Sequence, residues 1–302
     1  TMSICLLILS ASGCSTHSPS LPIYVEPEIL PEASDKEAIS AETTDLKYSA
    51  SVSNEVTKPI TLDPVSTEPV LEPELTVDLW QRMRIGFELN ITDLPSVVND
   101  QREWYLNNPS YLTTVFNRSR PFLYHVVEEL EQANLPLELA LLPVVESTYD
   151  PLAYSSSHAA GLWQFIPSTG QQYGLTRNRW YEGRRDVVKS TSAAITYLSY
   201  LHQRFDEDWL LALAAYNAGE GSVSKAIQKN KKLGLPTDFW HLKLPKETRN
   251  YVPQLLALSA LIKRSEQFAI KLPNIPNEKY FETIEISNQI ALSLVLDISG
   301  ID

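Results

Sequence analysis

The stretch from Leu137 to Phe165, LELALLPVVESTYDPLAYSSSHAAGLWQF, decides how this chain is expected to fold. Its first nine residues have hardly any polar face, which predicts a buried helix over residues 137–145. Glu146 stands at the end of that helix, where burial and the partial negative charge of the helix C-terminus both raise the pKa of a carboxyl group. A carboxyl group that keeps its proton near neutral pH can serve as a general acid. A structural Glu146 that turns toward solvent is the alternative that this stretch leaves open.

The second half of the stretch is rich in small and hydroxyl side chains. The hydroxyls of Ser155 and Ser157 can orient a substrate oxygen, and Gly161 allows another backbone to approach closely. Trp163 offers a flat apolar face, and the Gln164 amide can both donate and accept hydrogen bonds. The same segment would also suit ordinary core packing, so this pattern alone does not identify a binding site.

Apolar residues at helical spacing predict further helices on both sides of this stretch. Before it, we expect one from Trp80 through Leu89, one over 100–107 and one that opens at Ser119-Arg120-Pro121. After it, we expect helices over 186–205, 209–216 and 247–263. Tyr216 and Asn217 end the second of these, where Asn217 also suits a helix C-cap, and Tyr251 lies on the third, where periodicity favours a core position.

The first 14 residues predict a secretory signal segment. The apolar run from Ile4 to Leu9 is too short to span a bilayer, and the following Ala11-Ser12-Gly13-Cys14 resembles a bacterial lipobox. Cys14 would then carry lipid and anchor the protein, with Ser15 favouring the outer membrane over the inner one. A free thiol in an apolar leader is the alternative. Cys5 would leave with the signal, so neither cysteine predicts a disulfide or a metal site.

Residues 15–77 are predicted to form a disordered, acidic, proline-rich tether. The stretch 15–79 holds 8 of the 20 prolines, no glycine and a net charge of −10 out of −12 for the chain. Such a composition cannot bury enough apolar surface to offset the entropy of ordering. The overall negative charge also argues against nucleic acid as a partner.

Four motifs in order resemble the lytic transglycosylases of the soluble-lytic-transglycosylase type, which are related in fold to goose-type lysozyme. They are Glu146-Ser147 nine residues ahead of Ser155, then Gly161-Leu162-Trp163-Gln164, then 215–219 (AYNAG), then 249–253 (RNYVP). The resemblance covers about residues 78–272. It implies a mainly α, lysozyme-like domain with a substrate cleft, divided into a helical prelude at 78–118 and a catalytic domain at 119–272.

The resemblance also implies roles for single residues. Glu146 matches the family's catalytic acid, which protonates the β-1,4 glycosidic oxygen between N-acetylmuramic acid and N-acetylglucosamine in peptidoglycan. It then acts as base toward the muramoyl 6-hydroxyl, which gives a 1,6-anhydro product without water. Further matches to residues that line the cleft and bind substrate are Ser155, Ser157, Gln164, Tyr216, Asn217 and Tyr251.

Two other functions are compatible with this constellation. A goose-type lysozyme would hydrolyse the same bond. A protein without catalytic activity would act as a scaffold that only binds the peptidoglycan of the cell wall. We find no second carboxylate for the site in the sequence, whereas an ordinary glycosidase needs two, and the resemblance to lytic transglycosylases explains this because their reaction uses a single acid. The sequence hardly separates lysis from hydrolysis, but similarity along the whole domain favours the lytic reaction. We expect a monomer that acts on peptidoglycan glycan strands and faces the periplasm. The five histidines show no ligand spacing, so neither a metal nor another cofactor is implied.

The sequence departs from the family in two places. Residues His158-Ala159-Ala160 vary ahead of the GLWQ motif, which we interpret as loop variation rather than a catalytic histidine. The second departure is that family members usually continue into LysM modules that bind the cell wall, whereas this sequence stops at Asp302. We expect either that the sequence is a fragment of a longer protein or that the protein binds the cell wall through its catalytic cleft alone. Residues 273–302 are expected to form a tail in which Glu285 to Asp302 resembles the first helix of such a module.

Overall fold

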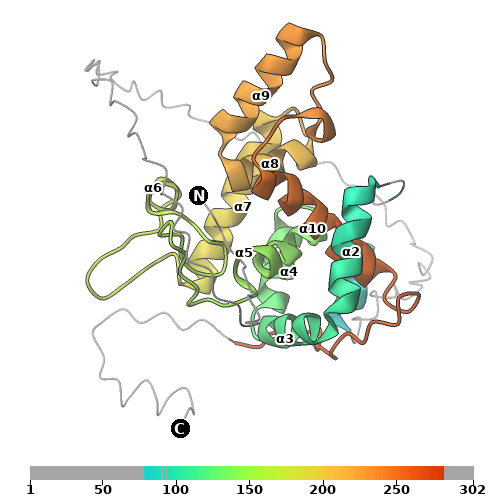
Figure 1. Cartoon of the computed structure of the whole chain (residues 1–302). Coiled ribbons are helices and arrows are strands. Elements are labelled where there is room, and N and C mark those ends of the chain that lie inside the picture. Colours follow the sequence, from blue (N-terminus) through green and yellow to red (C-terminus); the bar gives the residue numbers. More distant parts are fainter. Residues whose placement is uncertain (1–77, 90–91, 93, 282–302) are drawn as a thin grey trace, which may run out of the picture. The chain divides into compact units, whose positions relative to one another are not determined.

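The computed structural model describes residues 78–89, 92 and 94–281, and these residues fold mainly into helices (Figure 1). The helices are, in chain order, α1 (Leu79–Ile85), α2 (Ser96–Asn107), α3 (Pro109–Ser119), α4 (Leu123–Gln132), η1 (Leu137–Leu141), α5 (Leu142–Ser147), α6 (Pro167–Gln172), α7 (Val187–Arg204), α8 (Trp209–Ala218), α9 (Glu220–Leu233), η2 (Phe239–His241) and α10 (Lys246–Lys263). In this part of the chain, β structure is limited to isolated bridges such as Tyr154 with Ala160. The prediction of a mainly α fold is confirmed.

Helix α10 lies at the centre of the packing. It contacts α2, α8, η1 and α5, and Figure 1 shows it between α2 and α8. Nearly every side chain from Tyr251 to Ile262 is buried. Helix α2 belongs to the expected prelude and α10 to the expected catalytic domain, and residues of the two helices lie in one hydrophobic core. The expected prelude and catalytic domain therefore share this core. The division at residue 118 stays a prediction.

The apolar run that opens the central stretch is buried as predicted, but it does not form one helix. Residues 137–141 form the 3-10 helix η1, and α5 begins at Leu142 with Pro143 in its first turn. Proline has no N–H to donate, so the hydrogen-bond ladder restarts there, as it does at a helix N-terminus. Helix α5 then ends at Ser147, and its C-cap Thr148 has a left-handed φ of 54°. Glu146 therefore lies in the last turn of a very short helix.

Helices α7 and α8 follow the sequence closely. Asp186 caps α7 by accepting a hydrogen bond from the Lys189 N–H at 2.9 Å. Asp208 caps α8 in the same way, and that helix continues past the predicted end to Ala218. The C-cap alternative for Asn217 is therefore wrong, because this residue lies inside α8 and Gly219 ends the helix.

Two helix predictions were wrong near the beginning of the described part. The helix that starts beside Trp80 ends at Ile85 with Gly86 as its C-cap, and Gly86 packs so closely against Leu137 that a Cβ there would lie 2.5 Å from that side chain. Pro121 does not open a helix. It lies in the turn between α3 and α4, and α4 begins at Leu123. Helices α3, α6 and α9 were not predicted.

Several predictions concern residues outside the described part. Cys14, the tether at 15–77 and residues 282–302 of the tail all lie there. Within the described residues, no helix combines the length and hydropathy that a membrane span requires.

Candidate active site

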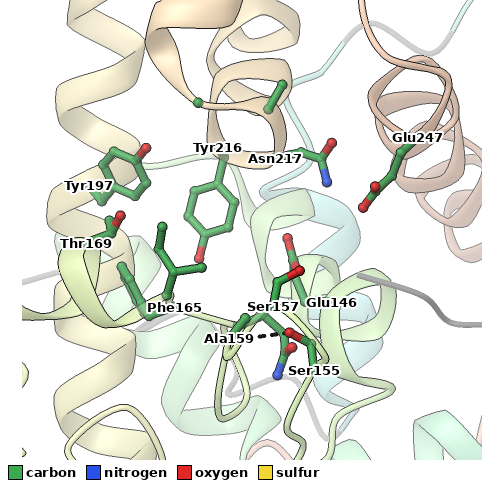
Figure 2. Close-up of a pocket in the computed structure, with 14 residues that line it drawn as sticks. Glu146, Ser155, Ser157, Ala159, Phe165, Thr169, Tyr197, Tyr216, Asn217 and Glu247 are labelled. Carbon is green, nitrogen blue, oxygen red and sulfur yellow. Dashed lines mark hydrogen bonds between the residues drawn. The ribbon is translucent and has the colours of Figure 1, made fainter. Parts of the chain in front are cut away.

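A cavity of about 200 Å³ opens beside Glu146 (Figure 2). It is lined by the ends of α5, α8 and α10, by residues of α6 and α7, and by the loop between α5 and α6. The lining residues are Glu146, Ser155, Ser157, Ala159, Gln164, Phe165, Ile166, Thr169, Tyr197, Tyr216, Asn217, Ala218, Gly219 and Glu247. Five of the six predicted substrate-binding residues and the predicted acid therefore meet at one cavity.

Glu146 is buried, with 7% of its surface exposed. The Tyr251 hydroxyl donates a hydrogen bond to its Oε1 atom at 2.6 Å. The pKa of Glu146 is raised to about 8: burial raises it most, the hydrogen bond from Tyr251 lowers it, and the negative charge of Glu247 raises it. At neutral pH the carboxyl group therefore carries its proton, and it lies where a substrate oxygen in the cavity can receive that proton.

The loop after α5 places its hydroxyl and amide groups through local hydrogen bonds. Ser147 Oγ lies 2.8 Å from the Leu162 carbonyl and 3.2 Å from the Pro143 carbonyl, which ties the end of α5 to the loop. Ser155 Oγ accepts from the Ala159 N–H at 3.0 Å. Gln164 Nε2 donates to the Gly161 carbonyl at 2.9 Å. These bonds fix the cavity wall before any ligand arrives.

Asn217 reaches the cavity from the end of α8. Its Oδ1 atom accepts from the Thr248 hydroxyl at 2.7 Å, so the amide NH₂ is the group that faces the cavity. Figure 2 shows this amide between Glu146 and Glu247. An NH₂ group in this position can donate to an oxygen of a ligand bound beside Glu146.

Tyr251 is the predicted residue that does not line the cavity. Its ring projects from α10 into the protein core, and its hydroxyl contacts Glu146 on the side that faces away from the cavity. The structure thus places it as a support for the acid. Trp163 is fully buried, and its indole N–H donates to the Thr191 hydroxyl at 3.0 Å. Of the two interpretations of Trp163, packing is the one that the structure supports.

Comparison with known proteins identifies the family. The model described as "Transglycosylase SLT domain" matches residues 126–237. Membrane-bound lytic murein transglycosylase D of Escherichia coli K12 is 44% identical over 224 residues, which are 74% of this chain and 49% of that protein. A putative tributyltin chloride resistance protein of Alteromonas is 40% identical over 159 residues, 53% of this chain and 76% of that protein. This chain belongs to the SLT-domain family.

The chain spans about half the length of the first of these curated relatives. Among solved structures, the 70 kDa soluble lytic transglycosylase of Escherichia coli matches with a TM-score of 0.39 and 20% identity, over 59% of this chain and 32% of that chain.

Glu247 is one residue of this SLT-domain site that sequence analysis missed. It lies in the first turn of α10 and lines the cavity, and Figure 2 shows its carboxylate directed toward the space beside Asn217 and Glu146. The expectation that no second carboxylate belongs to the site is therefore wrong. Residues four apart share a helix face, so the spacing of Glu247 and Tyr251 was the available signal.

An aromatic wall was also missed. Tyr197 of α7 and Phe165 line the cavity beside Tyr216. The rings of Tyr197 and Tyr216 have centroids 5.3 Å apart, and Phe165 lies 6.3 Å from each. Flat apolar rings of this kind can pack against the faces of sugar rings.

Arg184 supports the SLT-domain cavity loop between α5 and α6 from outside the cavity. Its side chain is buried, with Nη1 donating to the carbonyls of His158 and Phe165 at 2.7 and 2.9 Å. Its other nitrogens donate to Glu182 at 2.8 and 2.7 Å, which neutralises the buried charge. Gly161 has a φ of +80°, and a Cβ there would lie 1.8 Å from the Arg184 carbonyl oxygen. The loop can therefore close only around glycine at this position.

The described residues contain no group of three or more His, Cys, Asp or Glu side chains arranged to hold a metal ion. His158 is exposed at the outer side of the loop and does not line the cavity.

Proposed function

We propose that this protein is a lytic transglycosylase that cleaves the β-1,4 bond between N-acetylmuramic acid and N-acetylglucosamine in peptidoglycan. Glu146 donates its proton to the glycosidic oxygen as that bond breaks. The resulting carboxylate then accepts the proton of the muramoyl 6-hydroxyl, whose oxygen attacks C1 and closes the 1,6-anhydro ring. The proton count balances without water, and Glu146 ends the cycle protonated.

The observation that carries this proposal is the state of Glu146. One buried carboxyl group, with a pKa raised to about 8, adjoins a cavity with a hydroxyl-bearing loop and an aromatic wall. A group with a pKa near the working pH can both give and take a proton, which the two steps require. The names of the relatives support peptidoglycan as the substrate.

Asn217 and Ser157 are proposed to orient the sugar in the cavity. The Asn217 NH₂ group faces the space beside Glu146, and Ser157 lines the wall opposite the aromatic rings. Both can bond to the acetamido group and hydroxyls of a sugar. Tyr251 is proposed to keep the carboxyl group of Glu146 in a single orientation through its 2.6 Å hydrogen bond.

A hydrolase is the second candidate function, and Glu247 is the observation that favours it. Inverting glycosidases use a second carboxylate as the base that activates water. Glu247 lines the same cavity as Glu146 and would be the group to take that role. In the proposed lytic reaction, Glu146 carries out both proton transfers and Glu247 takes part in neither.

Mass analysis of products separates the candidates. The full chain and its Glu146→Gln variant are incubated with peptidoglycan sacculi, and soluble muropeptides are analysed. Anhydro products from the parent, with none from the variant, are expected. Products heavier by one water would assign a hydrolase. If the variant released as much anhydro product as the parent, the role assigned to Glu146 would be wrong. If the parent bound sacculi but released no products, the protein would be a non-catalytic scaffold that binds peptidoglycan.

We also propose that lipid on Cys14 anchors the protein to the outer membrane, facing the periplasm. The lipobox-like residues support this, and a curated relative carries "membrane-bound" in its name. Expression in bacteria fed a labelled fatty acid tests it. Label is expected in the parent at the outer membrane and absent from a Cys14→Ser variant. Equal labelling of both would contradict the assignment.

A further inference from the structure

The loop that forms one wall of the cavity has a second, outward face. Along residues 152–158, exposure alternates: Ser155 and Ser157 line the cavity, whereas Leu152, Tyr154 and His158 are exposed. Tyr154 keeps 53% of its surface exposed although it directly precedes a cavity residue. A ligand that enters the cavity and continues over this loop would meet both faces.

Basic and aromatic groups lie on this outward face and on the loop between α6 and α7. The Arg185 guanidinium lies 5.8 Å from the centroid of the Tyr154 ring, and the Tyr154 hydroxyl lies 2.7 Å from His158 Nδ1. The Arg179 guanidinium lies 5.4 Å from the centroid of the Trp180 ring, and Trp180 is 88% exposed. We call these five residues the basic rim. Among the described residues, neither Arg179 nor Arg185 forms an ion pair, whereas Arg177 and Arg184 both pair with Glu182.

The basic rim is held in place by hydrogen bonds of its own. Asn178 Oδ1 accepts from the N–H groups of Trp180 and Tyr181 at 2.8 and 2.9 Å, which closes a tight turn. Gly183 N–H donates to the Thr176 carbonyl at 2.9 Å below that turn. Figure 1 shows the chain between α6 and α7 as a long loop that extends beyond the helices.

This loop is tied to the cavity wall. Arg184, at its base, bonds both Glu182 and the His158 carbonyl. An exposed tryptophan on a hydrogen-bonded turn, coupled to the cavity wall in this way, indicates a preformed contact surface.

The chemistry of the basic rim fits carboxylates carried on a glycan. Guanidinium groups bind carboxylates through paired N–H donors, and aromatic rings beside them pack against apolar portions of the same ligand. In peptidoglycan, the peptide branches from the lactyl group of muramic acid, so a muramoyl unit in the cavity must send its peptide out over a wall. That peptide bears free carboxylates.

We infer that the basic rim binds the acidic stem peptide of the glycan strand, so that this protein acts preferentially on peptide-bearing strands. The inference rests on the proposed function and adds the form of the substrate to it. Tryptophan beside arginine also occurs at anionic lipid surfaces. Tyr154 and His158 belong to the cavity loop itself and Arg185 contacts Tyr154, which favours the peptide.

The test compares two substrates and two variants of the full chain. Glycan strands are prepared with their stem peptides and, in parallel, after an amidase has removed the peptides. The variants are Arg179→Gln/Arg185→Gln and, as a matched control for lost surface charge, Lys229→Gln/Lys232→Gln on the exposed side of α9. Initial rates of anhydro-product release are measured at low substrate concentration, with binding to vesicles containing anionic lipid as a second readout.

The parent is expected to act faster on peptide-bearing strands. The arginine variant is expected to lose about threefold per arginine on those strands, a typical effect for exposed charge contacts, and nothing on peptide-free strands. The lysine control should match the parent on both, and added salt should reduce the parent's preference.

The other outcomes overturn the inference. Equal losses of rate on both substrates would mean that the arginines contact the glycan or stabilise the fold. Unchanged rates on both substrates would mean that the basic rim does not contribute to the reaction. Weaker vesicle binding by the arginine variant, with the substrate preference intact, would assign the rim to membranes. A parent that releases no anhydro product from either substrate would instead contradict the proposed function.

Discussion

The substitution Glu146→Gln is expected to stabilise the protein in a pH-dependent way while it abolishes activity. In the folded protein, burial raises the pKa of Glu146 from 4.5 to about 8. At pH 7 the unfolded chain releases this proton and the folded protein retains it. Because the unfolded state binds fewer protons between these two pKa values, the free energy of unfolding falls as pH rises through that window.

The magnitude follows from the width of the window. A pH of 7 lies 2.5 units above the ordinary pKa of the carboxyl group, 4.5, and below its pKa of about 8 in the folded protein. At 1.36 kcal/mol per unit, the penalty at pH 7 is about 3 kcal/mol. Glutamine has nearly the same shape, does not titrate, and can still accept the hydrogen bond from Tyr251. The variant should therefore be more stable than the parent by about 3 kcal/mol at pH 7 and equal to it near pH 4.

Urea unfolding of the parent and the variant at pH 4 and pH 7 measures this difference. For a folded unit of this size the gain at pH 7 corresponds to a rise in Tm of about 6 to 12 °C. Glu266→Gln is the matched control, since this glutamate is exposed, and it should change stability by less than about 0.5 kcal/mol at either pH. If the two proteins had the same stability at both pH values, the Glu146 carboxyl group would be ionised and solvated in the folded state, and the general-acid argument would fail.

Four further predictions concern the surroundings of Glu146. Activity should decline above about pH 8 as Glu146 loses its proton, and Tyr251→Phe should move this alkaline limb of the pH–rate profile upward, because the lost hydrogen bond favoured the ionised carboxylate. Glu247→Gln should move the same limb downward, because a nearby negative charge is removed; limbs that shift in one direction for both variants would contradict these assignments. Gly161→Ala should destabilise the protein by more than about 3 kcal/mol in urea unfolding, since the new Cβ meets the Arg184 carbonyl oxygen at a positive φ, and near-parental stability would show that the loop can move aside. Arg184→Met should raise KM with a smaller change in kcat and no shift of the alkaline limb, with partial rescue in Arg184→Lys; an equal loss from both variants would indicate a loss of folding instead.

The sequence alone determined those features that depend on local periodicity and short motifs. Helices α7 and α10 are long and amphipathic, and α8 is uniformly apolar. The N-caps of α7 and α8, Asp186 and Asp208, are of a residue type that prefers helix N-termini. The apolar run before Glu146 was enough to predict burial and therefore the direction of the pKa shift of that residue. The order of the motifs was enough to indicate the family.

Only the tertiary structure decided the details that make the site. Glu247 and Glu146 are far apart in the chain, and packing of α10 against α5 brings them to one cavity. Trp163 and Arg184 are polar or amphipathic residues whose burial depends on distant partners, Thr191 and the His158 carbonyl. Sequence periodicity reports which face of an element is apolar, but not which other element covers that face. For this reason the acid could be predicted from its own helix, whereas the groups that tune and frame it could not.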